Sequence, residues 1–127
     1  WVFISACDMP FINGELIKYM ASKRDNYDAV VPKYNESNPP QSPSTKGGPR
    51  GDYTEPLFAF YSKQLMPSME KAIFSNKTGI KDFLMDKRVK YIFNREIKGI
   101  DAKAMSFINL NTLKDVGRVR GFKGLSE

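Results

Sequence analysis

An apolar run at the start of the chain, and the way it ends, constrain the fold most strongly. Trp1–Ala6 has two β-branched residues and no charge, the pattern of a strand buried on both faces in a parallel sheet. Asp8 and Pro10 end the run, and Asn13 suits the N-cap of a following helix. Ala29–Val31 predicts a second strand. The order strand, helix, strand indicates a βαβ unit, and therefore an α/β fold with a mostly parallel sheet flanked by helices.

The composition changes abruptly in the middle of the chain. Residues 33–54 are rich in Asn, Ser, Pro, Gly and Lys, so a mobile loop is predicted there. Lys46–Gly51 within it has the composition of a phosphate-binding loop. Such a loop follows a buried strand and opens a helix, and this segment has neither neighbour. We therefore reject it as the main nucleotide site and expect it to move over the active site or bind a second, anionic substrate.

Regular elements are predicted again after this loop. The aromatic segment Leu57–Tyr61 indicates a buried strand, and the apolar spacing within Lys63–Phe74 indicates a helix with Pro67 near its first turn. The pattern continues with a short helix near 80–84, a strand at 89–93, a last strand at 106–111 and a closing helix from 112. Residues 1–127 show no repeat and are expected to form a single domain.

The charge of the chain predicts an anionic partner. There are 20 Lys and Arg against 14 Asp and Glu, a formal net charge of +6. A nucleotide, a phosphorylated cofactor, nucleic acid and an acidic membrane surface all fit the charge itself. Scattered basic residues without an RNP-like or zinc motif argue against nucleic acid. The sequence has no histidine, which removes the commonest general base and most zinc sites.

Cysteine usage and hydropathy predict a location. Cys7 is the single cysteine, so no internal disulfide can form, and we expect a small buried thiol in a reducing cytoplasm. No stretch of about 18 apolar residues is present, and the opening segment has no basic leader or cleavage site. Neither membrane insertion nor secretion is expected.

Three side chains are candidates for chemistry. Asp8 follows a buried strand, and in open α/β sheets ligands collect at the carboxyl ends of the strands. Its carboxylate suits Mg²⁺ beside a polyphosphate, although a turn residue before Pro10 carries equal weight from spacing alone. Asn109 and Asn111 are two apart in the predicted last strand, so both would project from one face and could address one ligand. On the residues alone, a turn or a helix cap is favoured for this pair.

Four segments, in this order, resemble the molybdenum cofactor guanylyltransferases, members of the wider nucleotidyltransferase superfamily. Val2–Ile12 is similar to the family's "CDMPFL" segment, and Asp28–Pro32 to its "DAVVP" strand. Glu55–Tyr61 resembles "EPLFAVY", and Phe107–Thr112 resembles "FFNINTPEDL". One departure is Leu113, which stands where the family often has proline. The ordered set spans nearly the whole chain and is fairly specific.

The resemblance implies a Rossmann-like nucleotidyltransferase fold and a reaction. GMP would pass from GTP to molybdopterin, with release of pyrophosphate, in molybdenum cofactor biosynthesis. Asp8 would be catalytic, coordinating Mg²⁺ and touching the GTP phosphates, while Asn109 and Asn111 would shape the nucleotide and cofactor pocket. GTP and molybdopterin would be the substrates, and proteins of molybdoenzyme maturation are further candidate partners.

One part of the family pattern has no counterpart in these residues: the amino-terminal strand and the Gly-rich "GGxSxRMGxDK" loop that cradles the triphosphate. We therefore expect residues 1–127 to be a partial domain with negligible transferase activity and weak GTP binding alone. Two alternatives stay open. One is a sister transferase that uses CTP with molybdopterin or acts on another phosphorylated metabolite, and the other is a noncatalytic fragment or partner subunit. An exposed flank beside Trp1 and Phe3 is also expected, and it would favour self-association.

Overall fold

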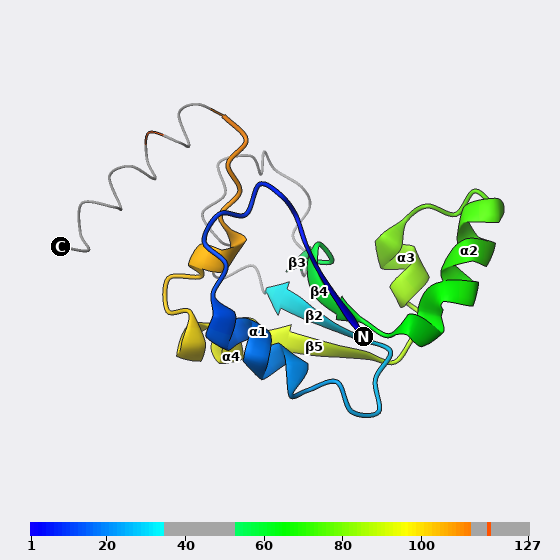
Figure 1. Ribbon diagram of the computed structural model, residues 1–127, viewed down its shortest axis with the longest axis horizontal. Helices are drawn as coiled ribbons and strands as arrows, with labels where there is room; N and C mark the ends of the chain where they lie inside the picture. Colours follow the sequence, from blue (N-terminus) through cyan, green and yellow to red (C-terminus); the bar gives the residue numbers. More distant parts are fainter. Residues whose placement is uncertain (35–52, 113–116, 118–127) are drawn as a thin grey trace.

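The computed structural model describes residues 1–34, 53–112 and 117, and shows one sheet with helices on either side (Figure 1). The strands are β1 (Val2–Ser5), β2 (Ala29–Tyr34), β3 (Tyr53–Thr54), β4 (Phe58–Tyr61) and β5 (Val89–Phe93). The α-helices are α1 (Gly14–Ala21), α2 (Met66–Phe74), α3 (Ile80–Leu84) and α4 (Asn94–Ile100). Two 3₁₀ turns are η1 (Lys63–Leu65) and η2 (Met105–Phe107). The predicted α/β class is confirmed.

The sheet is mixed, with three strands running in one direction. β2 and β5 pair in parallel, while β4 is antiparallel to both β1 and β2 and lies between them. β1 and β2 therefore run the same way, as a βαβ unit requires, but they are not neighbours. The short β3 lies on the same side of β2 as β4. Lys33 of β2 pairs with Thr54 of β3 on that side and with Phe93 of β5 on the other side. The carboxyl ends of β1, β2 and β5 consequently lie at one edge of the sheet.

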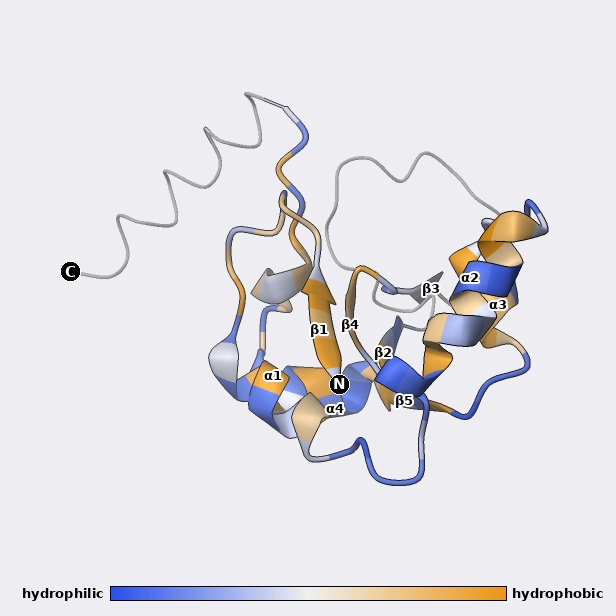
Figure 2. Ribbon diagram, turned by 45° about the vertical axis from the view of Figure 1, so that its right-hand side comes forward, coloured by the Kyte–Doolittle hydropathy of each residue, from blue (hydrophilic) through white to orange (hydrophobic). Residues whose placement is uncertain are grey.

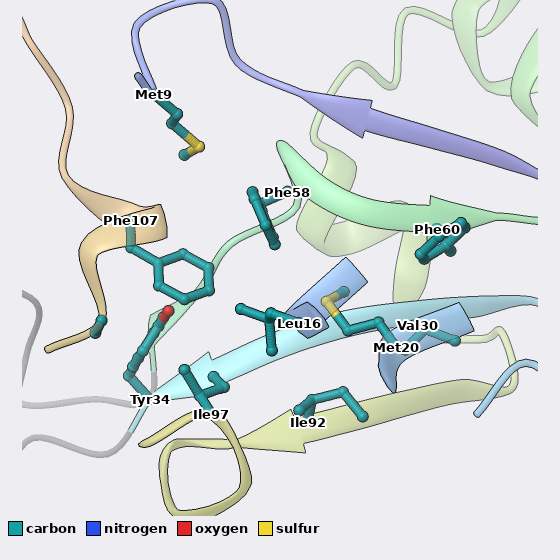
Figure 3. Close-up of a cluster of buried hydrophobic side chains, with 11 residues drawn as sticks. Met9, Leu16, Met20, Val30, Tyr34, Phe58, Phe60, Ile92, Ile97 and Phe107 are labelled. Carbon is teal, nitrogen blue, oxygen red and sulfur yellow. The ribbon is translucent and has the colours of Figure 1, made fainter. Parts of the chain in front are cut away.

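Alternating residues of β2 face two different hydrophobic cores. Val30 and Tyr34 belong to the first core, which α1 and α4 cover (Figure 3). Val31 belongs to the second, to which η1, α2 and α3 contribute side chains. Figure 2 shows α2 and α3 on the opposite side of the sheet from α1 and α4. This period of two is what a strand buried on both faces requires. The two layers of helices are therefore built on a shared central strand.

Local signals in the sequence explain where α1 and α2 begin. The side chain of Asn13 accepts hydrogen bonds from the amides of Glu15, at 2.9 Å, and Leu16, at 3.3 Å, so it caps α1 as predicted. Pro67 occupies the first turn of α2, where its missing N–H costs nothing. The described part of the chain contains no helix long and apolar enough to cross a bilayer.

β1 is less buried than expected. Phe3 packs against Phe58 and Phe60 in the first core, with ring centroids 5.0 and 4.9 Å apart, but Val2 and Ile4 on its opposite face are 46% and 39% exposed. The prediction of a strand buried on both faces was therefore wrong. β1 pairs with β4 alone among the described residues, and the second core does not extend beneath it. Cys7, expected to be buried, is exposed in the loop after β1.

Two further predictions were wrong in the later part of the chain. Residues 106–111 do not form a strand: Ser106 and Phe107 lie in η2, and 108–111 have no regular structure. The carboxylate of Asp101 accepts hydrogen bonds from the amides of Met105 and Ser106, which favours a turn at the start of this segment. The predicted loop 33–54 is also too long, because its ends belong to β2 and β3. Residues 35–52, including Lys46–Gly51, and the predicted closing helix beyond Thr112 lie outside the described residues.

Candidate active site

Asp8 lies in a loop directly after the carboxyl end of β1. Two main-chain bonds shape this loop: the amide of Ala6 donates to Leu57, at 2.8 Å, and that of Met9 to Ala6, at 3.4 Å. The side chain of Met9 is buried in the first core, while Asp8 is half-buried. The loop is therefore anchored on one side and presents its carboxylate at the edge of the sheet where ligands bind in open α/β folds.

The segment carrying the two asparagines crosses this loop. The amide of Leu110, between Asn109 and Asn111, donates to the main-chain carbonyl of Asp8 at 2.9 Å. The structure thus brings the three predicted site residues to one place, although the asparagines do not share a strand. Asn109 Oδ1 is buried and has no hydrogen-bond partner among the described residues, whereas Asn111 is exposed. A buried amide oxygen without a donor is suited to accept from a ligand.

Glu55 is a fourth residue of the site, which the sequence did not identify as functional. Ser5 pairs with Phe58, so the turn before β4 lies beside the loop after β1. Main-chain bonds hold Glu55 on both sides, from its amide to Pro32, at 3.0 Å, and from Phe58 to its carbonyl, at 3.2 Å. The turn is fixed further by the hydroxyl of Tyr61, which donates to the carbonyl of Pro56 at 2.6 Å.

The carboxylate of Glu55 is influenced by burial and by the charge of Asp8, whose loop lies beside its turn. Burial raises the pKa of Glu55, the negative charge of Asp8 raises it further, and Lys81 partly opposes both. Glu55 is half-buried, and a carboxylate in that setting gains from a cation or from N–H donors. The site therefore carries two neighbouring acidic side chains in a protein of net charge +6.

Tyr34 is a core residue whose hydroxyl is influenced by the charge of Glu55. Its side chain is 2% exposed and packs against Phe107, with ring centroids 5.0 Å apart, and its hydroxyl has no partner among the described residues (Figure 3). Burial raises the pKa of Tyr34 strongly, and the charges of Glu55 and Asp101 raise it further. The phenol therefore stays neutral at physiological pH.

The oxygen atoms gathered here fit a hard divalent cation. Mg²⁺ prefers oxygen ligands and is commonly held by one or two carboxylates together with substrate phosphates. The carboxylates of Asp8 and Glu55 and the unpartnered Oδ1 of Asn109 are donors of this kind. Within residues 1–34 and 53–112, no group of three or more Cys, Asp or Glu side chains is placed to hold a metal.

A separate concavity of about 870 Å³ lies between α2 and α3, away from this site. Its lining includes both positively charged lysines and negatively charged aspartates. It does not include Asp8, Glu55, Asn109 or Asn111. The size of this concavity carries no chemistry by itself. We regard the Asp8 edge as the candidate site because the segment of Asn109 is bonded to the Asp8 loop there, and the turn of Glu55 lies beside the same loop.

Comparison with known proteins identifies the family. Residues 1–91 match the model of the MobA-like NTP transferase domain. The chain belongs to this family. A protein of Pelotomaculum thermopropionicum named as a probable molybdenum cofactor guanylyltransferase is 31% identical over 117 residues, which cover 92% of this chain and 49% of that protein. One of the same name from Natranaerobius thermophilus is 32% identical over 127 residues, covering 98% of this chain and 54% of that protein.

A solved structure agrees with this membership. The crystal structure of molybdopterin-guanine dinucleotide biosynthesis protein A from Archaeoglobus fulgidus superposes with a TM-score of 0.73 at 25% identity. The match covers 96% of this chain and 55% of that one. The MobA-like chain thus spans about half the length of the relatives it matches. The resemblance to molybdenum cofactor guanylyltransferases inferred from the sequence is confirmed at the level of the family.

Proposed function

We propose that this chain forms part of a nucleotidyltransferase domain that transfers GMP from GTP to molybdopterin, in the cytoplasm. The product would be the guanine dinucleotide form of the molybdenum cofactor, with pyrophosphate released. The names of the relatives support the reaction class. The observation that supports the proposal for these residues is the main-chain bond from Leu110 to Asp8, which holds the segment of Asn109 and Asn111 against the loop after β1.

The transfer is a substitution at phosphorus. An oxygen of the terminal phosphate of molybdopterin would attack the α-phosphorus of GTP, and the bond from that phosphorus to the oxygen of the β-phosphate would break. The electron pair leaves with pyrophosphate, so no oxidant or reductant is needed. Catalysis of such a step depends on alignment of the two phosphates and neutralisation of their charge.

The residues of the site fit these two tasks. Asp8 and Glu55 would hold Mg²⁺, which when bound supplies positive charge to the phosphate oxygens. Asn109 would accept a hydrogen bond through its buried Oδ1, and Asn111 would contact a substrate from the exposed side of the segment. The main-chain bond between Leu110 and Asp8 would keep Asn109 and Asn111 at a fixed position relative to Asp8.

The test measures GTP affinity and molybdopterin-dependent release of pyrophosphate. For residues 1–127 alone we expect weak GTP binding and negligible turnover, and robust turnover would contradict that expectation. For the native protein containing these residues we expect turnover with GTP. Competition between GTP and CTP separates the guanylyl reaction from a sister transferase. Absence of molybdopterin-dependent turnover with every nucleotide would favour a noncatalytic partner subunit.

A further inference from the structure

Asp101 is a buried carboxylate whose two oxygens are both occupied by main-chain donors. It directly follows α4 and is 6% exposed. Oδ1 accepts the amide of Met105 at 3.0 Å, and Oδ2 accepts that of Ser106 at 2.9 Å. Hydrogen bonds to a charged acceptor are about twice as strong as neutral ones. This carboxylate therefore dictates the shape of η2.

The turn that Asp101 shapes is tied to the start of α1. Ser106 is fully buried, and its Oγ accepts the amide of Asn13 at 3.0 Å. Asn13 in turn caps α1 through its side chain. Because Asn13 ends the stretch that begins at Asp8, the turn after α4 is connected to the candidate site through these two residues.

Phe107 fixes the same turn from its other side. Its side chain is 1% exposed, and its ring lies 5.0 Å from that of Tyr34 and 4.9 Å from that of Phe58 (Figure 3). Two residues further along is Asn109, and the amide of Leu110 then bonds to Asp8. The segment is thus held at η2 and at Leu110, with Asn109 between the two anchors.

We propose that Asp101 is a positioning residue for the transfer site, fixing η2 so that Asn109 and Asn111 are presented beside Asp8. The inference rests on the proposed function, because it takes these three residues to contact the substrates. Asp101 itself is buried beneath the turn and touches no substrate. Its removal is therefore expected to act on catalysis through the placement of its neighbours.

Amide hydrogen exchange on the 127-residue chain tests the structural half of this proposal. Asp101→Asn turns one acceptor into an NH₂ group facing a main-chain donor, so exchange at Met105 and Ser106 should accelerate. The proposal requires that Leu110 also exchange faster, while Ile92 in β5 keeps its rate. Faster exchange at the turn with an unchanged Leu110 would show that Asp101 does not position the site.

Steady-state kinetics on the native protein test the functional half. Asp101→Asn is expected to lower kcat/KM for pyrophosphate release about 100-fold at a temperature where the variant is folded, since small misplacements have effects of that order. Asp101→Glu, which retains the charge, should recover part of the loss. Asp86→Asn is the matched control, since Asp86 is an exposed carboxylate away from the site. A folded Asp101→Asn variant with the wild-type kcat/KM would overturn the proposal.

Ser106→Ala keeps the proposal testable if Asp101→Asn does not fold. It removes the acceptor of the Asn13 amide but leaves both bonds of Asp101 in place. We expect faster amide exchange at Asn13 and Leu110 and a raised KM. Unchanged exchange at Leu110 together with an unchanged KM would contradict the proposal that the turn positions the site. Failure of the proposed function is distinguishable, because the wild-type protein would then release no molybdopterin-dependent pyrophosphate, whatever the exchange at Leu110 shows.

Discussion

The amide of Leu110 donates to the main-chain carbonyl of Asp8 across 2.9 Å, joining the two ends of the described chain. The bond uses no side-chain atom, so the loop after β1 and the segment after η2 stay in contact whatever side chain stands at position 8. Isosteric substitution at Asp8 can therefore change the charge of the site without moving its backbone. Substitutions at Asp8 can therefore test the role of its charge separately from the position of the loop.

Asp8→Asn should abolish most of the transfer activity of the native protein while leaving its fold intact. The amide keeps the shape of the carboxylate but not its charge, so we expect kcat/KM to fall about 100-fold. Pyrophosphate release under steady-state conditions measures this. Asp25→Asn, at an exposed site after α1, is the control and should match the wild type.

The same substitution should be detectable at Glu55. Burial is the larger cause of the raised pKa of Glu55, and the charge of Asp8 is the second. Asp8→Asn removes only the second cause, so the pKa of Glu55 should fall but stay above its ordinary value. Carbon-detected NMR titration of the glutamate carboxyl groups reports this directly. An unchanged midpoint would mean that the two carboxylates are not neighbours.

Glu55→Gln should stabilise the metal-free protein at neutral pH. The folded-state pKa of Glu55 is raised, so the folded chain binds this proton more tightly than the unfolded chain, and the wild type loses stability as the pH rises through that range. The variant has no such loss. Melting temperatures from pH 3 to pH 8 should diverge in favour of the variant as the pH rises and converge near pH 3.

Added Mg²⁺ should make the wild type melt at a higher temperature than Glu55→Gln, the reverse of the metal-free order. Binding to the folded state raises the melting temperature of the wild type, whereas the variant lacks one of the two carboxylates. A rise of equal size in both proteins would count against Glu55 as a ligand.

Phe107→Ala should destabilise the chain by about 3 kcal/mol or more, because it empties a fully buried aromatic site. The ring contacts both Tyr34 and Phe58, so little collapse is available to fill the space. Urea unfolding measures the change. Phe74→Ala is the control: this side chain is 90% exposed on α2, and its loss should change stability by less than about 0.5 kcal/mol.

Ile4→Lys should reduce self-association of the 127-residue chain. Val2 and Ile4 of β1 are 46% and 39% exposed, and Trp1 just before the strand is 38% exposed. The outer edge of β1 has no partner among the described residues. Charges on such an edge disfavour pairing between copies. Light scattering over a concentration series should show association of the wild type and less of it in the variant. Phe74→Lys on α2 should associate like the wild type, and a reversed pattern would assign the effect to α2.

The α/β class and most elements were predictable because their signals are local. Asn13 caps α1 through its own side chain, and the apolar segments 29–31, 57–61 and 89–93 all became strands. The position of β4 between β1 and β2 had no local signal, because it depends on pairing between distant segments. Glu55 was missed as a site residue for the same reason: the strand register is what sets it beside Asp8.

The error at 106–111 has a local cause that the sequence does contain. The composition of the segment suits a strand, but Asp101 precedes Met105 and Ser106 at a spacing from which its carboxylate can reach both amides. A short acidic side chain before an apolar segment can accept hydrogen bonds from main-chain amides that would otherwise pair in a sheet. The segment of Asn109 and Asn111 lies against the Asp8 loop nonetheless, because the Leu110 amide is bonded to Asp8 instead of to a strand.

The insertion of β4 between β1 and β2 has a consequence for synthesis. Within the described residues, β1 is made first, yet its neighbour is Phe58–Tyr61, which leaves the ribosome only after α1 and β2. The nascent apolar segment 1–6 must wait for that strand, and pairing over such long separations is slow and prone to aggregation. Ribosome-bound chains ending before residue 58 should therefore depend on chaperones more than chains released after Tyr61.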